Sequence, residues 1–336
     1  MTRAGKGRGT STLGSWTVWA ASIVVAAVLL AYFLRGIDGA RLYQTARNAS
    51  PGPFVAFLVL FATGVAARTT RFWVLLARSV PFRTVFGITL VRNLLVDLLP
   101  ARLGELSYVY LVTTKGRRPV EEGVATMAVA FLLDLVALSP LVLAALLIVG
   151  GGSLIPVWIA WTVSGLLAGG GIVAVALAGP LARILSGRLD KAGAAGWRAA
   201  AATRLRTLSA SLDRAKRQGV LLPAMFLSLV VRLCKYGSAY CLVLSLMVPL
   251  GYSMAELGVL RIFLGSIAAE VAASLPIHGL AGFGTYEAAW TLTLEELGYP
   301  RDHAVISGLL AHAITQGIEY VFGGAAIVWL STRRTA

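Results

Sequence analysis

Residues 92–108 read RNLLVDLLPARLGELSY, and this polar, interrupted stretch lies within a chain that is otherwise strongly apolar. Its polar side chains are Arg92, Asn93, Asp97, Arg102, Glu105 and Tyr108. A charged side chain near the centre of a bilayer costs at least ~2.5–3.5 kcal/mol, so it is retained where it faces a protein interior or a water-filled cavity. Pro100 removes a backbone donor, and together with Gly104 it predicts two half-helices that meet at a break. Because irregular backbone is tolerated at membrane depth only inside protein or beside a cavity, we expect this break to line a binding site.

A second stretch, EVAASLPIHGLAGFGTYEAAW at residues 270–290, repeats the order of these features. In both stretches an acidic residue is followed by Leu-Pro, then by glycine, then by glutamate. The candidate site residues of the second stretch are Glu270, Pro276, His278, Gly282, Gly284, Tyr286 and Glu287. Paired interrupted segments at corresponding positions of two halves indicate the binding site of a transporter. The alternative is a chance similarity, since proline and glycine are common in membrane helices.

The composition of the chain indicates an all-α polytopic membrane protein. Of its 336 residues, 57% are hydrophobic and 13% are charged, whereas about 25% are charged in a typical soluble domain. The net charge of +15 is assigned to cytoplasmic loops and anionic lipid headgroups rather than to nucleic acid, because the basic residues fall mostly between apolar runs. The sequence contains no P-loop and no HExxH motif, and it predicts no cofactor and no metal site.

Long apolar runs predict about six full spans and two broken, re-entrant segments. The spans are expected at about residues 16–34, 54–76, 124–149, 154–178, 220–247 and 304–330, and the broken segments at about 84–113 and 254–297. The alternative is a set of eight plain transmembrane helices. The expected domains are a basic tail (1–15), a first membrane half (16–179), a basic amphipathic linker (180–219), a second membrane half (220–331) and a short tail (332–336).

Basic residues cluster in the 78–83 turn, the 115–118 loop, the linker and the C-terminal tail. The positive-inside rule places these segments and both termini in the cytoplasm, if each broken segment enters and leaves the membrane on the same side. The two halves then have opposite orientations, which is the inverted repeat of alternating-access transporters. Leu205, Leu208 and Leu212 recur at helical spacing, so the linker is expected to form an amphipathic helix on the cytoplasmic face of the cell membrane.

Several spans carry polar residues that are candidates for the cavity or for coupling. These are Arg68, Arg71, Asp134, Arg232, Lys235, His312, Gln316 and Glu319. Arg68 and Arg71 are interpreted most simply as reaching lipid headgroups at a helix end, and alternatively as pointing into a cavity. His312, Gln316 and Glu319 share one helical face, which is expected to look into the cavity. The alternative for this face is an interhelical hydrogen-bond network that holds the bundle together.

Two motifs resemble a known family. The Leu-Pro-x-Arg-x-Gly-Glu core at residues 99–105 and the Gly-x-Gly-Thr-Tyr-Glu end at residues 282–287 are similar to the transmembrane region of lysylphosphatidylglycerol synthases and of related flippase-like membrane proteins. The resemblance covers nearly the whole chain. It implies movement of a lipid with a polar headgroup between leaflets, with both motifs near the headgroup path. The chain ends shortly after its last expected span, so aminoacylation of lipid by this chain alone is not expected.

These features together predict a lipid flippase or transporter. Arg92 and Arg102 are expected to bind a lipid phosphate, because guanidinium matches phosphate oxygens. The spacing of Arg102 and Glu105 also allows an ion pair on one face. The acidic residues near the breaks are expected to hold the arginines in the empty state or to bind a cationic headgroup; they are Asp97, Glu105, Glu270 and Glu287. Transport is either downhill or coupled to protons through Glu287, His312 or Glu319.

The expected partners are membrane lipids, namely an anionic phospholipid, an aminoacyl-phospholipid or a polyprenyl-linked lipid. A separate synthase or glycosyltransferase is a candidate protein partner. Two other classes remain open. An integral-membrane enzyme acting on a lipid (pyro)phosphate would release phosphate in a purified system. A non-catalytic membrane scaffold would tolerate replacement of its charged residues.

Overall fold

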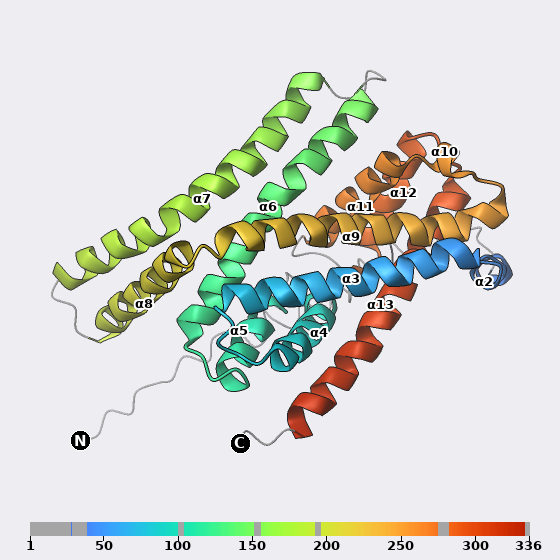
Figure 1. Ribbon diagram of the computed structural model, residues 1–336. Coiled ribbons are helices and arrows are strands. Elements are labelled where there is room, and N and C mark those ends of the chain that lie inside the picture. Colours follow the sequence, from blue (N-terminus) through green and yellow to red (C-terminus); the bar gives the residue numbers. More distant parts are fainter. Residues whose placement is uncertain are drawn as a thin grey trace, which may run out of the picture.

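The computed structural model describes residues 28, 39–99, 104–150, 156–191, 196–274 and 282–332, and all regular structure in these ranges is helical (Figure 1). The helices are α2 (Gly39–Arg47), α3 (Pro51–Leu75), α4 (Phe82–Leu98), α5 (Glu105–Thr114), α6 (Val120–Gly150), α7 (Val157–Lys191), α8 (Trp197–Arg217), α9 (Leu221–Met247), η2 (Val248–Leu250), α10 (Met254–Leu257), α11 (Val259–Ala273), α12 (Thr285–Glu296) and α13 (Arg301–Thr332). The all-α expectation is therefore confirmed.

Within the described ranges, five helices are long and apolar enough to cross a membrane. They are Pro51–Leu75, Val120–Leu147, Val157–Asp190, Leu221–Leu250 and Arg301–Thr332. An α-helix rises about 1.5 Å per residue, so each exceeds the ~30 Å thickness of a hydrocarbon core. The sixth expected span, at residues 16–34, and the tails at 1–15 and 333–336 lie outside the described residues.

Both broken segments are pairs of short helices rather than single spans. Helix α4 ends at Leu98 and α5 begins at Glu105, while α11 ends at Ala273 and α12 begins at Thr285. In each pair the two helices pack against one another as a hairpin. The alternative of eight plain transmembrane helices is therefore wrong.

The first hairpin is tight enough to require glycine at its bend. A Cβ atom on Gly104 would lie 2.0 Å from the backbone oxygen of Leu95, far inside van der Waals contact. The chain returns so closely over α4 that no side chain fits between the two helices. This close approach brings Glu105, the next residue, beside the C-terminal half of α4.

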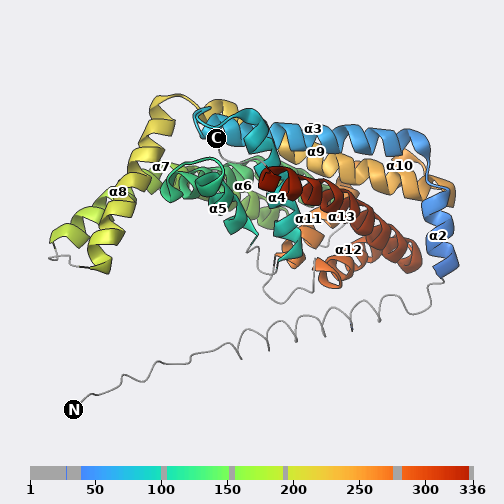
Figure 2. The same cartoon turned by 90° about the horizontal axis from the view of Figure 1, so that it is seen from below.

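Helices α3 and α9 lie side by side and antiparallel (Figures 1 and 2). At one end, the backbone N–H of Ser50, just before α3, donates to the carbonyl oxygen of Ser245 near the end of α9 at 2.8 Å. Farther along, a Cβ on Gly64 would lie 3.2 Å from the Cβ of Cys234. Small residues at this contact let two long helices approach closely, which is typical of membrane helix pairs.

The helices of the two expected halves make corresponding contacts. Helix α4 of the first hairpin packs on α13, the helix that follows the second hairpin, and α11 of the second hairpin packs on α6, the helix that follows the first hairpin. Each hairpin also has its own apolar core, one around the buried Tyr108 and the other around the buried Trp290. The polar side chains between the hairpins are consequently enclosed by helices from both halves.

Helices α7 and α8 form a separate hairpin at the edge of the molecule (Figures 1 and 2). Helix α7 continues through Pro180 to Lys191, so the first part of the expected linker is an extension of the preceding span. Helix α8 folds back along it: Ser209 donates to the carbonyl of Gly179 at 3.1 Å and Lys216 to that of Ala176 at 2.8 Å.

The apolar face of α8 packs partly on protein. Leu212 is buried and Leu208 is partly buried within the core around Tyr108. The predicted stripe thus packs on protein, because the extended α7 and the adjacent α6 supply a surface that covers it. The basic residues of α8 remain on its other sides, where Arg206 pairs with Asp190 of α7.

Candidate functional site: a charged cavity between the two hairpins

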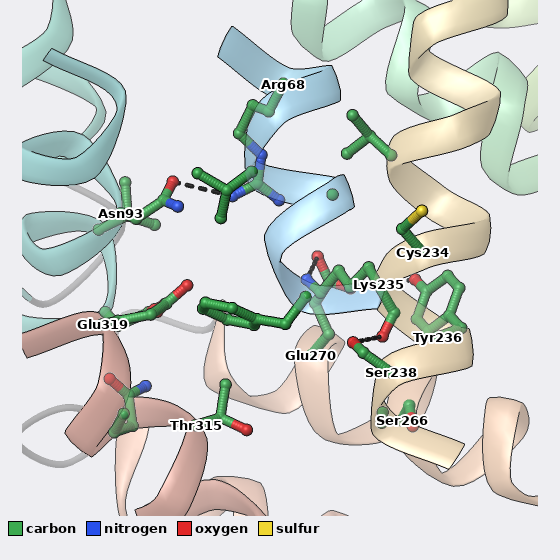
Figure 3. Close-up of a pocket in the computed structure, with 18 of the residues that line it drawn as sticks. Arg68, Asn93, Cys234, Lys235, Tyr236, Ser238, Ser266, Glu270, Thr315 and Glu319 are labelled. Atoms are coloured by element: carbon green, nitrogen blue, oxygen red, sulfur yellow. Dashed lines mark hydrogen bonds and ion pairs between the residues drawn. The ribbon is translucent and has the colours of Figure 1, made fainter. Parts of the chain in front are cut away.

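A cavity of about 240 Å³ lies among α3, α4, α6, α9, α11 and α13. Basic and acidic side chains line it in equal number: Arg68, Arg92, Arg232 and Lys235 against Asp97, Asp134, Glu270 and Glu319. Figure 3 shows side chains from α3, α4, α9, α11 and α13 converging on this space. Since charged groups are retained at membrane depth where a cavity or partners stabilise them, the geometry of these charges indicates what the cavity binds.

On one side of the cavity, five charged groups alternate in sign. Arg71 pairs with Asp134 and donates to Ser228 at 2.8 Å. Asp134 also lies 3.7 Å from Arg232, which in turn lies 3.4 Å from Glu270. The chain of charges ends with Lys235, whose Nζ is 2.9 Å from Glu270.

This alternating network joins the two halves of the molecule. Arg71 and Asp134 belong to α3 and α6, whereas Arg232 and Glu270 belong to α9 and α11. Arg71 is only 2% exposed, so its charge depends on these partners: an unpaired buried ion is strongly destabilising. Tyr236 adds a hydrogen bond from its hydroxyl to Glu270 at 3.0 Å. The network therefore connects the two halves through ion pairs and hydrogen bonds.

On the opposite side, two arginines share one amide oxygen. The Oδ1 atom of Asn93 accepts hydrogen bonds from Arg68 at 2.8 Å and from Arg92 at 3.3 Å (Figure 3 shows the Arg68 contact). Arg92 is neutralised by Glu105, which accepts from its Nε and Nη2 atoms at 2.9 and 2.5 Å. Arg68 makes no ion pair with any carboxylate in the described ranges, so its guanidinium charge is directed at the cavity.

Two carboxyl groups line the cavity from α4 and α13. They belong to Asp97 and Glu319. Within the described parts of the chain, neither group lies within ion-pair distance of Lys or Arg. Arg68 and Lys235 line the same cavity.

The second glycine-rich motif forms a cradle around His312. Gly282 and Gly284 adopt φ angles of +76° and +91°, which residues with a Cβ rarely adopt. This backbone path places Phe283 and Tyr286 on either side of the His312 ring, with centroid distances of 4.5 and 4.2 Å. The Gly-Phe-Gly-Thr-Tyr-Glu sequence therefore builds the surroundings of one histidine on the next helix, α13.

Glu287 completes the cradle. It is only 1% exposed, accepts from the backbone N–H of Gly284 at 2.7 Å and lies 2.6 Å from Nδ1 of His312. On the other edge of the ring, Nε2 of His312 lies 3.2 Å from the amide nitrogen of Gln316. The other amide atom, Oε1 of Gln316, is buried and has no hydrogen-bond partner in the part of the chain that the structure describes.

Comparison with protein families shows to which family the chain belongs. The family model of the lysylphosphatidylglycerol synthase transmembrane region matches residues 19–323. The chain belongs to this family. The match includes both hairpins and the cavity, and it confirms the resemblance drawn from the two motifs. No curated protein matches the chain in sequence.

Most candidate residues of this lysylphosphatidylglycerol synthase transmembrane-region protein lie at the cavity. Those lining it are Arg68, Arg92, Asn93, Asp97, Asp134, Arg232, Lys235, Glu270, Gly282, Tyr286, His312, Gln316 and Glu319. Those packed behind it are Arg71, Gly104, Glu105, Tyr108, Gly284 and Glu287. Pro100, Arg102, Pro276 and His278 lie outside the described residues, so the expected Arg102–Glu105 pair stays a prediction.

The simpler interpretation of Arg68 and Arg71 does not hold. Neither side chain extends to a headgroup at the helix end: Arg71 is buried on Asp134, and Arg68 lines the cavity on Asn93. The reason is that α3 packs along α9 and α4 at this level, so the inward face of α3 is covered by protein.

Sequence reasoning also missed several polar groups of the cavity. Tyr236, Ser238, Ser266, Ser274 and Thr315 line it. Tyr236 and Ser238 lie within one turn of Lys235, and Thr315 precedes Gln316. Ser266 and Ser274 lie four residues before and after Glu270. Helical spacing from these candidate residues is the signal that could have found them. Among the described residues, no cluster of His, Cys, Asp and Glu has the arrangement of a metal site.

Proposed function

We propose that this protein moves a membrane lipid with a phosphate-bearing headgroup between the two leaflets, using the cavity between the hairpins as the headgroup site. The observation that carries the proposal is the Arg68–Asn93–Arg92 group, in which the guanidinium of Arg68 faces the cavity and pairs with no carboxylate of the described residues. Guanidinium groups bind phosphate oxygens in a planar, two-pronged geometry. The family match adds a link to lysylphosphatidylglycerol synthases, whose name refers to a lipid product.

The position of Arg68 supports an anionic ligand. Leaving Glu287 and His312 aside, the described groups around the cavity are five basic side chains, Arg68, Arg71, Arg92, Arg232 and Lys235, and five acidic ones, Asp97, Glu105, Asp134, Glu270 and Glu319. The two kinds are equal in number, so the support for an anion comes from the orientation of Arg68 toward the cavity and not from a net charge.

The helix arrangement supports alternating access. Suppose that α3 and α9 are the corresponding helices of the two halves. Because they run antiparallel, the twofold axis that relates them is perpendicular to both. This is the geometry of an inverted repeat. Rocking of one hairpin against the other would expose the cavity to each leaflet in turn. We infer the same topology as from the sequence, with the protein in the cell membrane and both termini in the cytoplasm.

The test is lipid movement by the purified protein in vesicles. Headgroup-labelled phosphatidylglycerol, an aminoacyl-phosphatidylglycerol and a polyprenyl phosphate are each incorporated, and an impermeant quencher reports the outer-leaflet fraction over time. Arg68→Gln should abolish protein-dependent movement, and Arg68→Lys should retain part of it because the charge stays while the two-pronged contact is lost. Arg206→Gln on α8, far from the cavity, is the matched control.

The outcomes separate the candidate functions. Movement of a phosphate lipid that depends on Arg68 but not on Arg206 supports the proposal. Equal movement by the wild type, Arg68→Gln and empty vesicles would contradict it. Release of phosphate from a lipid pyrophosphate in the same vesicles would instead indicate an integral-membrane phosphatase.

A further inference from the structure

The cradle around His312 is more elaborate than packing requires. A buried carboxylate is stable as an ion only when it is paired, and Glu287 makes no ion pair with Lys or Arg in the described ranges. Its only titratable contact there is Nδ1 of His312. The two aromatic rings that enclose the imidazole present faces that attract a positive charge.

Gln316 can pair with Nε2 of this histidine in either protonation state. With a neutral ring, Nδ1–H donates to Glu287 and Nε2 accepts from the amide nitrogen of Gln316, while Oε1 of Gln316 has no partner among the described residues. When the ring is protonated, Nε2 also carries a hydrogen. Rotation of the Gln316 amide by half a turn then brings Oε1 to that hydrogen, and the amide nitrogen gives up its contact with the ring. Both ring nitrogens therefore keep a partner when a proton is taken up.

Other charged groups around the cavity set the electrostatic context of His312. On its own helix, α13, Glu319 lies on the same face. The titratable groups on neighbouring elements that line the same cavity are Arg68 on α3, Arg92 and Asp97 on α4, Asp134 on α6, Arg232, Lys235 and Tyr236 on α9, Glu270 on α11 and Tyr286 on α12.

We propose that the His312–Glu287 dyad is a proton-binding site and that a proton binds together with the lipid phosphate. The inference rests on the proposed function for the identity of the ligand. Uptake of one proton adds one positive charge to the cavity and therefore strengthens binding of an anionic headgroup. Because linkage is reciprocal, binding of the headgroup must also draw a proton onto the protein.

The first experiment measures proton uptake without any transport. Short-chain phosphatidylglycerol is added to detergent-solubilised protein in weak buffer that contains a pH indicator, and inorganic phosphate is added in a parallel sample. The wild type should take up as much as one proton per bound lipid, and His312→Gln should take up none. Glu296→Gln, an exposed position on the same helix as Glu287, should behave as the wild type. Uptake with inorganic phosphate as well would show that the site recognises phosphate rather than the lipid.

The second measurement observes the histidine directly. The chain has only three histidines, so ¹⁵N spectra of the ring nitrogens are simple, and the signal absent from His312→Gln identifies His312. The expected result is a ring that becomes protonated on addition of lipid, and that fails to do so in Glu287→Gln. A ring that stays neutral in the wild type with and without lipid would overturn the proposal.

The third measurement connects the site to transport. For one proton carried per lipid, a gradient of one pH unit shifts the leaflet ratio about tenfold, in opposite senses for the two directions of the gradient. In His312→Gln the leaflet ratio should stay the same with and without the gradient. Wild-type lipid movement with no response to the gradient would refute the coupling while leaving the proposed function intact. Proton uptake without lipid movement would instead refute the proposed function while leaving the proton site intact.

Discussion

Glu105, the first residue of α5, accepts two hydrogen bonds from Arg92 of α4, at 2.9 and 2.5 Å. The two residues are brought together by the bend at Gly104, and their pairing closes the first hairpin. The same pair holds the guanidinium of Arg92 beside Asn93 and thus beside Arg68. Hairpin closure and the arrangement of the Arg68–Asn93–Arg92 group are therefore one structural feature.

Removing one partner of the Arg92–Glu105 pair should destabilise the hairpin. The side chains are 12% and 21% exposed, so the penalty should fall below that of a fully buried pair, at about 1–3 kcal/mol. Glu105→Leu leaves a cation without its bidentate partner, and the double variant Arg92→Leu/Glu105→Leu should be more stable than the sum of the single effects. Thermal unfolding of the four purified proteins in detergent measures this coupling, and strictly additive effects would show that the pair contributes nothing.

Replacing Asp134 with Asn should be among the most damaging single changes. Arg71 would then be buried at 2% exposure without its carboxylate, which is expected to cost about 3–5 kcal/mol. Asp302→Asn removes the carboxylate of the exposed Arg41–Asp302 pair by the same substitution and should cost at most ~1 kcal/mol. Comparable melting temperatures for the two variants would contradict the role of the buried network.

Gly104→Ala should open the first hairpin. The new methyl group would lie 2.0 Å from the oxygen of Leu95, and separation of α4 from α5 should cost about 1–3 kcal/mol, as overpacking typically does. Gly165→Ala in α7 is the matched control: nothing lies within 4 Å of its added Cβ, and alanine favours the helix by up to ~1 kcal/mol. The prediction fails if both variants unfold at or above the wild-type temperature.

Gly64→Cys should form a disulfide with Cys234 on mild oxidation. The two Cβ positions are 3.2 Å apart, close to the ~3.5–4.5 Å of protein disulfides. The bond would be detected by mass spectrometry of peptides before and after reduction. Gly169→Cys, on α7 with open space around it, should leave Cys234 as a free thiol. An absence of cross-linking in Gly64→Cys would argue against the antiparallel contact of α3 with α9.

The sequence by itself determined the features that are encoded locally. The length of the apolar runs determined the class of the protein, because an uninterrupted helix of that length has to be covered by lipid or protein. Pro100 and Gly104 marked the first break, although the reason for Gly104 is a contact with Leu95 of the preceding helix. The 3.6-residue period placed His312, Gln316 and Glu319 on one face, and all three line the cavity.

Only the tertiary structure decided which of these groups meet. The partner of Asp134 is Arg71, from a helix 63 positions earlier in the chain, and that of His312 is Glu287, from another helix. The packing of α8 on α6 and α7 was settled in the same way. The physical reason is that helical periodicity fixes the face on which a side chain lies, whereas the element opposite that face is fixed by the packing of helices distant in sequence. Ion pairs and buried hydrogen bonds form across such contacts, so their partners follow from the packing.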